Sequence, residues 1–161
     1  MEELQHCEIL KTNINVTNMS DTIKYIGGHL DDLRGKYICV SNVHTTVMSY
    51  ENEEYRKIQN GAAMALPDGA PLSSYSRRKG YKQAQRVTGP DLMLELFAIS
   101  KEKGYRHYFY GATEETLQSM KEVLERDYPG IQIAGMYAPP FRALTPQEDA
   151  QIVAKINESR P

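Results

Sequence analysis

The 161-residue sequence lacks tryptophan and holds two cysteines, three phenylalanines and no long apolar run. A membrane-spanning helix needs roughly 20 consecutive apolar residues, so none is predicted. Positive charge has no surplus either, because 19 Lys and Arg residues stand against 21 Asp and Glu. The net charge of −2 argues against nucleic acid as a partner, since a nucleic-acid footprint needs an excess of cations. The N-terminus carries acidic side chains where a secretory signal peptide needs basic ones.

Motifs for metal, redox and dinucleotide chemistry are also missing. Cys7 and Cys39 form no Cys-x-x-Cys pair and lie in apolar runs, which predicts buried thiols in a reducing, cytoplasmic compartment. The four histidines show no metal-ligand spacing. The absence of Gly-x-Gly-x-x-Gly counts against a Rossmann dehydrogenase. Because no Asp-x-Asp occurs, a nucleotide-sugar site built on that metal clamp is not predicted, and we expect no cofactor.

What is present is the composition of an ordinary globular protein, with 40% hydrophobic and 25% charged residues. Short apolar runs alternate with longer patterns of helical period, an order typical of a parallel α/β sheet. Strands are expected at 37–40, 62–66, 107–110 and 131–134, with a hairpin or edge strands over 7–16. We predict a single α/β domain over 1–161, with a Rossmann-like, mostly parallel sheet flanked by helices and a small N-terminal hairpin.

The helices are predicted from caps and apolar spacing. Asn18 or Ser20 would cap the first, a second pattern over 43–59 would break near Glu51-Asn52, and Thr113 and Thr145 would cap two later helices. The run Tyr37–Val40 is typical of a strand covered on both faces. The stripes expected to be buried are Ile23, Ile26, Leu30 and Leu33 before Gly35, and Leu92, Met93, Leu96 and Phe97 before Gly104. No strand follows the last helix, so we expect the natural chain to continue beyond Pro161.

The candidate chemistry lies where the predicted strands end. In open α/β sheets ligands bind beyond the carboxyl ends of the strands, which would bring Asn42, Asp68 and Thr113 to one edge. A carboxylate directly after a buried strand, such as Asp68, is a candidate general base. Pro-Asp-Gly is also a common turn, so a purely structural role for Asp68 stays open.

Two further segments could meet phosphate groups. Gly111-Ala112-Thr113 precedes a helix and could present backbone N–H groups, although the pattern is also that of an ordinary strand-to-helix turn with a Thr cap. Arg86, with basic neighbours, could neutralise a pyrophosphate, or the segment could be a solvated loop. The neighbouring cations are Arg77, Arg78, Lys79 and Lys82.

Five motifs occur in the order and spacing of one known family. They are Val40-Ser41-Asn42-Val43-His44, Leu66-Pro67-Asp68-Gly69, Arg86-Val87-Thr88-Gly89-Pro90-Asp91-Leu92, Phe109-Tyr110-Gly111 and Tyr137-Ala138-Pro139-Pro140-Phe141. Through them the chain resembles, from about Ile9 to Pro161, the WecG/TagA/CpsF glycosyltransferases (glycosyltransferase family 26). The resemblance implies an inverting transferase of bacterial cell-surface polymers such as wall teichoic acid or exopolysaccharide. Its best-known members move N-acetylmannosamine or its uronic acid from a UDP donor to N-acetylglucosamine on undecaprenyl diphosphate.

The resemblance also implies roles for individual residues. Asp68 stands at the family's proposed catalytic base, and Asn42 and Arg86 stand at its pocket Asn and Arg. Val40 replaces a Thr that some members carry, so that hydroxyl is missing here. The expected substrate-binding set is Asn42, Arg86, Gly69, Gly111, Thr113 and Tyr137.

The family continues past the end of this chain into another strand, a loop with an active-site Gln and a basic membrane-docking tail. The resemblance therefore implies that the longer protein is peripheral at the inner face of the plasma membrane, and that this chain alone is inactive. A homo-oligomer is compatible with it. The alternative interpretation is a non-catalytic nucleotide- or sugar-binding α/β module.

Overall fold

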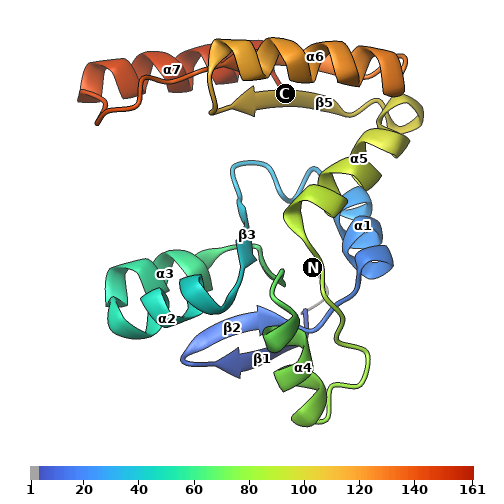
Figure 1. Cartoon of the computed structure of the whole chain (residues 1–161), viewed down its shortest axis with the longest axis vertical. Helices are drawn as coiled ribbons and strands as arrows, with labels where there is room; N and C mark the ends of the chain where they lie inside the picture. The colour runs from blue at the N-terminus through green and yellow to red at the C-terminus, as the bar shows by residue number, and fades with distance from the viewer. Residues whose placement is uncertain (1–3) are drawn as a thin grey trace. The chain divides into compact units, whose positions relative to one another are not determined.

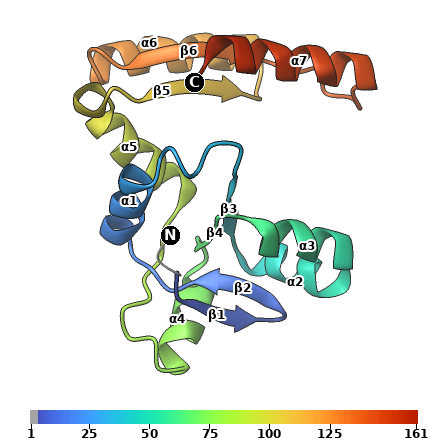
Figure 2. The same cartoon turned by 180° about the vertical axis from the view of Figure 1, so that it is seen from behind.

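The computed structural model describes residues 4–161. Its contacts divide the chain into two compact units, Met1–Glu95 and Leu96–Pro161, each with its own parallel strand pair. Figure 1 labels the elements along the chain, and Figure 2 shows the same elements from behind. The prediction of a mixed α/β fold, with parallel strands flanked by helices and an N-terminal hairpin, is confirmed.

The predicted hairpin opens the first unit. Strands β1 (His6–Ile9) and β2 (Thr12–Asn15) pair antiparallel, with Cys7 opposite Ile14. The two turn residues between them, Leu10 and Lys11, both have positive φ, the conformation that suits the twist of a two-residue hairpin.

A parallel pair follows the hairpin and defines the edge on which the candidate site lies. Strands β3 (Ile38–Ser41) and β4 (Met64–Pro67) pair with Ser41 opposite Pro67. The crossover consists of α2 (Val43–Glu51) and α3 (Glu53–Gly61), and α4 (Ala70–Arg78) follows β4. The predicted break between α2 and α3 is confirmed, because Asn52 is extended and caps α3.

Two expectations for this unit are wrong. Helix α1 (Met19–Gly28) begins at the predicted cap Asn18 but ends well before Gly35, leaving Leu30 48% exposed. The pair of glycines at its end explains the early stop, since glycine has a low helix propensity. Strand β3 is only half-covered, because Val40 is 37% exposed, whereas all four residues of β4 are buried.

The core of the first unit joins the hairpin to β4 and α4. Its buried members are Cys7, Ile9, Ile14, Ala65 and Leu72, with Val16, Cys39 and Tyr81 packed against them. Figures 1 and 2 both show β1 and β2 beside α4. Both thiols are free, Cys7 buried and Cys39 half-buried, and burial raises the pKa of Cys39. The side chain of Asn15 accepts a hydrogen bond of 2.6 Å from the amide of Ala65, which ties β2 to β4.

Helix α5 (Gly89–Lys103) begins in the first unit and ends in the second. Its start and its end before Gly104 are as predicted, and Thr88 Oγ accepts from the amide of Asp91. Leu92 and Phe97 are buried as expected. Met93 is 43% exposed, so the prediction that it belongs to the buried stripe of this helix is wrong.

The second unit has a parallel strand pair of its own. Strands β5 (Arg106–Tyr110) and β6 (Gln132–Tyr137) place Tyr110 opposite Tyr137, with a register shift at His107/Tyr108. Helix α6 (Glu114–Asp127) connects them, and α7 (Pro146–Ser159) follows β6. The predicted caps at Thr113 and Thr145 are confirmed.

No helix within residues 4–161 is long and apolar enough to cross a membrane.

Candidate functional site

The Pro67-Asp68-Gly69 turn is bonded directly to the end of the neighbouring strand. The amide of Asp68 donates to the carbonyls of Ser41, at 2.9 Å, and of Leu66, at 3.0 Å. The amide of Gly69 also points to the Ser41 carbonyl, at 3.5 Å. Asp68 is thus part of a turn, as its sequence suggested, and its side chain, 27% exposed, stands at the carboxyl end of β4.

Arg86 is brought to Asp68 by the loop between α4 and α5. Its Nε donates to the backbone carbonyl of Asp68, and its Nη2 donates to Asp68 Oδ1 at 3.3 Å. The amide of the next residue, Val87, donates to the Pro67 carbonyl at 3.0 Å, so the loop is fastened along β4. Two site residues that lie 18 positions apart in the sequence are therefore in direct contact.

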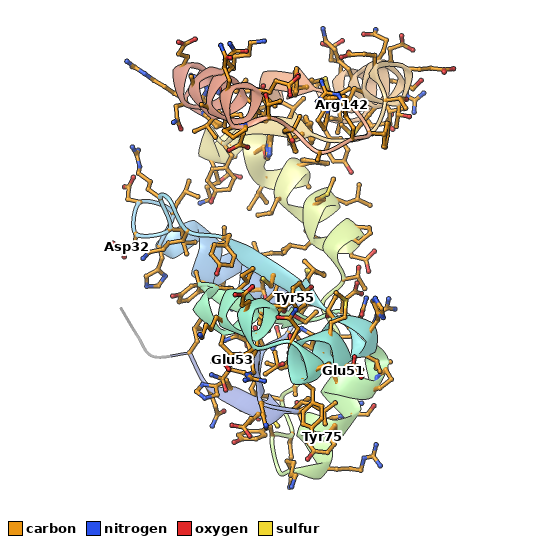
Figure 3. All side chains as sticks on the ribbon, turned by 90° about the vertical axis from the view of Figure 1, so that its left-hand side faces the viewer. Asp32, Glu51, Glu53, Tyr55, Tyr75 and Arg142 are labelled. Carbon is orange, nitrogen blue, oxygen red and sulfur yellow. The ribbon has the colours of Figure 1, made fainter. Side chains whose placement is uncertain are left out.

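The other cations near Arg86 do not join it. Arg77 donates to the Ala84 carbonyl at 2.7 Å and to Ser74 Oγ at 3.0 Å, which holds the loop in shape. Lys79 lies 5.5 Å from the ring centre of Tyr75, which Figure 3 labels on α4. Among the described residues, Arg77 and Lys79 thus contact other partners, and Arg86 is the arginine that contacts a site residue.

Asn42 lies at the same edge as the N-cap of α2. Its Oδ1 accepts from the amide of Thr45 at 3.1 Å, and Thr45 Oγ accepts from the amide of Asn42 at 2.9 Å. A Cβ placed on Gly69 would lie 3.5 Å from Asn42 Cα, so the Asp68 turn and the start of α2 touch. Helix α4 begins directly after Gly69 and has no side-chain cap. Two helix N-termini, which favour anions, therefore meet at this edge.

The remaining predicted residues gather in the second unit. The amide of Gly111 donates to the Tyr137 carbonyl at 3.0 Å, and the rings of Tyr110 and Tyr137 stack 6.2 Å apart. Thr113 Oγ accepts from the amide of Thr116 at 3.2 Å, which caps α6. Gly111, Thr113 and Tyr137 thus share the carboxyl end of the β5–β6 pair. That Thr113 meets Asn42 and Asp68 stays a prediction.

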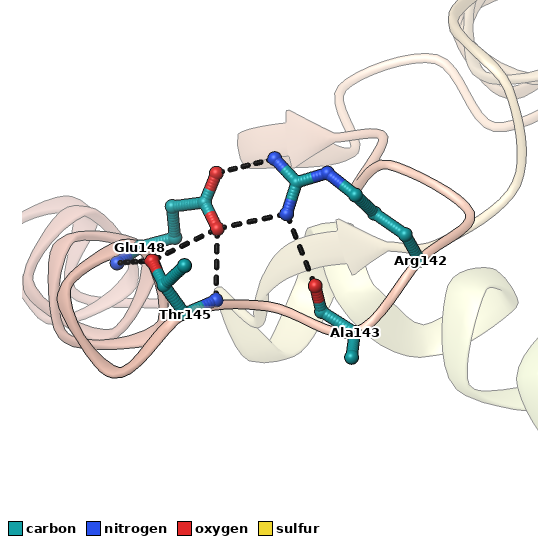
Figure 4. A network of polar contacts seen from close by, with 4 residues as sticks. All are labelled: Arg142, Ala143, Thr145 and Glu148. Atoms are coloured by element: carbon teal, nitrogen blue, oxygen red, sulfur yellow. Dashed lines mark hydrogen bonds and ion pairs between the residues drawn. The ribbon is translucent and has the colours of Figure 1, made fainter.

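An ion pair that sequence reasoning did not identify fixes the loop after Tyr137. Figure 4 shows that Arg142 forms a bidentate ion pair with Glu148. Arg142 Nη1 donates to Glu148 Oε2 at 2.9 Å, and Nη2 donates to Oε1 at 2.5 Å. The amide and hydroxyl of Thr145 donate to the same carboxylate, and together these hydrogen bonds lower the pKa of Glu148 to about 2. The Thr145–Glu148 capping box could be read from the sequence, but nothing local marked Arg142 as its partner.

Sequence reasoning also missed a buried polar pair beneath Asn42. Ser41 Oγ donates to Gln59 Oε1 at 2.7 Å, and both residues are buried. Gln59 sits in a run of polar helical residues, so no sequence signal distinguished it from a solvent-facing side chain.

Two open grooves lie elsewhere on the described residues. One of about 530 Å³ runs between α6 and β6, and one of about 310 Å³ lies between the hairpin and α3. Neither is lined by a predicted site residue. Within residues 4–161 no three His, Cys, Asp or Glu side chains are grouped so that they could hold a metal ion.

A carboxylate, an arginine and helix N-termini thus lie at the carboxyl ends of parallel strands, where open α/β sheets bind their ligands. The chain matches the Glycosyl transferase WecG/TagA/CpsF family over residues 7–161, and it belongs to that family.

Three similar curated proteins have one name, N-acetylglucosaminyldiphosphoundecaprenol N-acetyl-beta-D-mannosaminyltransferase. The protein of Bacillus spizizenii is 32% identical over 107 residues, which is 66% of this chain and 42% of the relative. That of Bacillus subtilis is 26% identical over 74% of this chain and 47% of its own length. That of Staphylococcus aureus is 22% identical over 96% and 59%, respectively. The chain thus spans about half the length of the curated relatives it matches.

Proposed function

We propose that this chain carries the catalytic base of an inverting glycosyltransferase. The enzyme would move N-acetylmannosamine, or a related sugar, from a UDP donor to N-acetylglucosamine on undecaprenyl diphosphate. Membership in the family and the name of its relatives support the transfer of N-acetylmannosamine and the lipid-linked N-acetylglucosamine acceptor. The UDP donor, the inversion and a peripheral position at the membrane follow from the resemblance and are part of the proposal.

The observation that carries the proposal is the contact between Arg86 and Asp68 at the end of β4. A residue whose backbone carbonyl and carboxylate both accept from one arginine, beside two helix N-termini, can take a proton next to a site suited to a diphosphate. Asn42, which lies 26 positions before Asp68, lies against the same turn through Gly69. The family's motif residues in this unit therefore occupy one small region.

In the proposed glycosyl transfer, Asp68 acts on the acceptor hydroxyl. Asp68 accepts the proton of the acceptor hydroxyl while the hydroxyl oxygen attacks the anomeric carbon from the face opposite UDP. The bond from that carbon to the β-phosphate oxygen breaks, and UDP leaves with the electron pair. Attack opposite the leaving group inverts the anomeric centre. A positioned base contributes about 10²–10⁴-fold, so stabilisation of the leaving diphosphate must contribute much of the remainder.

The charge on the leaving UDP would be met by Arg86 and by backbone N–H groups. Arg86 is suited to this because its side chain is 56% exposed, and no residue within 4–161 accepts from its Nη1. The starts of α2 and α4 supply oriented N–H groups at the same edge. Gly111, Thr113 and Tyr137 are proposed as further donor contacts, since α6 also begins at the end of a parallel strand.

The test is a chimera in which residues 7–161 replace the matching segment of the Bacillus spizizenii relative. Transfer of radiolabelled sugar from UDP-N-acetylmannosamine to a lipid-diphosphate-N-acetylglucosamine acceptor is measured beside the unaltered relative. We expect the chimera to transfer sugar and this chain alone to be inactive. A folded chimera that binds UDP but transfers nothing would instead favour the non-catalytic nucleotide-binding module.

A further inference from the structure

Ser41 is the point at which three parts of the first unit meet. Its backbone carbonyl accepts from the amides of Asp68 and Gly69. Its hydroxyl donates to Gln59 on α3 at 2.7 Å, and no part of its surface is exposed. Its neighbour in sequence is Asn42, the cap of α2. Any shift of Ser41 is therefore passed to both Asp68 and Asn42.

Gln59 holds Ser41 from the far side of the crossover. It is 6% exposed, although it lies on a helix whose other residues are exposed or half-exposed. Its Oε1 accepts from Ser41, and its Nε2 donates to the hydroxyl of Tyr55 at 3.3 Å, one turn earlier on α3. Tyr55 is labelled on this helix in Figure 3. Both polar ends of the buried amide are thus used, which fixes its orientation.

We infer that Gln59 is a positioning residue for Asp68, acting through the hydroxyl and carbonyl of Ser41. The inference rests on the proposed function of Asp68 as the base. We do not expect Gln59 to contact either substrate, because its side chain is buried and bonds to Ser41 at the end of β3. Its amide is needed because an apolar side chain would leave the buried Ser41 hydroxyl without a partner. Without this hydrogen bond α3 no longer holds the end of β3, and the backbone that bonds to Asp68 gains freedom.

The neighbouring residue on α3 provides a matched control. Asn60 donates to the Lys11 carbonyl at 3.0 Å and accepts from the amide of Asn13 at 2.9 Å, so it ties α3 to the hairpin turn. Gln59→Leu and Asn60→Ala therefore each remove hydrogen bonds of the same helix. Only Gln59→Leu loosens the strand end that bonds to Asp68.

The experiment is NMR of this chain, following the amides of Asp68 and Gly69 and the ¹³C signal of the Asp68 carboxyl through a pH titration. We expect Gln59→Leu to speed amide exchange at Asp68 by about tenfold or more, as for loss of one buried hydrogen bond, and to change the carboxyl titration. Asn60→Ala should change the hairpin amides and leave both Asp68 signals as they are. Unaltered Asp68 signals in folded Gln59→Leu would overturn the inference.

A second variant covers the case in which Gln59→Leu does not fold. The double variant Ser41→Ala/Gln59→Leu removes both partners, so no buried hydroxyl is left unpaired. It should fold and show the same altered exchange and titration at Asp68. If it folds with the wild-type Asp68 signals, Gln59 has no positioning role. Because these readouts need no turnover, they are independent of the chimera assay, which tests the proposed reaction itself.

Discussion

Arg86 contacts Asp68 twice, donating from Nε to its backbone carbonyl and from Nη2 to its carboxylate at 3.3 Å. The first contact holds the turn and the second orients the side chain. A base that must receive a proton from one direction benefits from both, because catalysis depends on the geometry of the proton transfer. Within residues 4–161 the Nη1 of Arg86 makes no hydrogen bond, so in the proposed reaction the base and the leaving group would share one cation.

Replacing the base should separate chemistry from binding. In the chimera, Asp68→Asn should lower the transfer rate by about 10²–10⁴-fold, because the amide cannot accept the hydroxyl proton. The affinity for UDP, measured by calorimetry, should change little. Asp32→Asn is the matched control, since Asp32 lies in the exposed turn labelled in Figure 3. Transfer near the wild-type rate in Asp68→Asn would refute the base assignment.

Arg86 should affect both binding and chemistry. Arg86→Ala removes a charge-assisted contact worth about 1.5–3 kcal/mol, so UDP should bind roughly 10–100-fold more weakly. Arg86→Lys keeps the charge but not the forked geometry and should recover binding only in part. Arg78→Ala removes one cation from an exposed position with no carboxylate within 4.0 Å among the described residues. Calorimetry should show equal UDP affinity in Arg78→Ala and wild type; weakening equal to that of Arg86→Ala would argue for a general charge effect.

His107 should make the second unit sensitive to mild acid. Ser100 Oγ donates to the Leu96 carbonyl, and His107 Nε2 lies 2.6 Å from Ser100 Oγ. Burial against Phe97 and Phe109 lowers the pKa of His107 below 6.5. A lowered pKa in the folded state means that the unfolded state binds the proton first. Stability should therefore fall as the pH drops through 6.5, until the folded-state pKa is passed.

The measurement is hydrogen exchange of the β5 and β6 amides between pH 7.5 and 5.5, corrected for the intrinsic rate. His107→Gln should remove most of the loss of protection. His44→Gln, at an exposed position of α2, should retain the loss seen in wild type. An equal loss of protection in His107→Gln would show that another group titrates.

Gly135 should tolerate no side chain while Tyr108 is present. A Cβ at this position would overlap the ring of Tyr108. Gly135→Ala should therefore destabilise the second unit by about 1–3 kcal/mol in urea unfolding. In the Tyr108→Ala background the same change should cost markedly less, because the overlap is gone. Gly28→Ala is a control, since nothing lies within 4 Å of its added Cβ. Additive effects at Gly135 and Tyr108 would contradict the steric account.

Much of this molecule could be derived from local signals. The caps at Asn18, Thr113 and Thr145 and the break at Asn52 depend on side chains that bond to backbone a few residues away. Such interactions need no distant partner, and the alternation of strand and helix follows from the same short-range patterns. The strand ends that carry Asn42 and Asp68 were therefore predictable, as was their meeting at one edge.

Other features depended on residues far apart in the sequence. That Arg86 contacts Asp68 while Arg77 holds its own loop depends on how the segment after α4 is fastened to Pro67. The exposure of Val40, the early end of α1 and the burial of Gln59 depend on which surfaces pack together. The elements and the residues at their ends could be read from the amino-acid sequence, because they depend on neighbours along the chain. Which side chains meet depends on the three-dimensional fold, because packing and long-range hydrogen bonds select among partners that are locally alike.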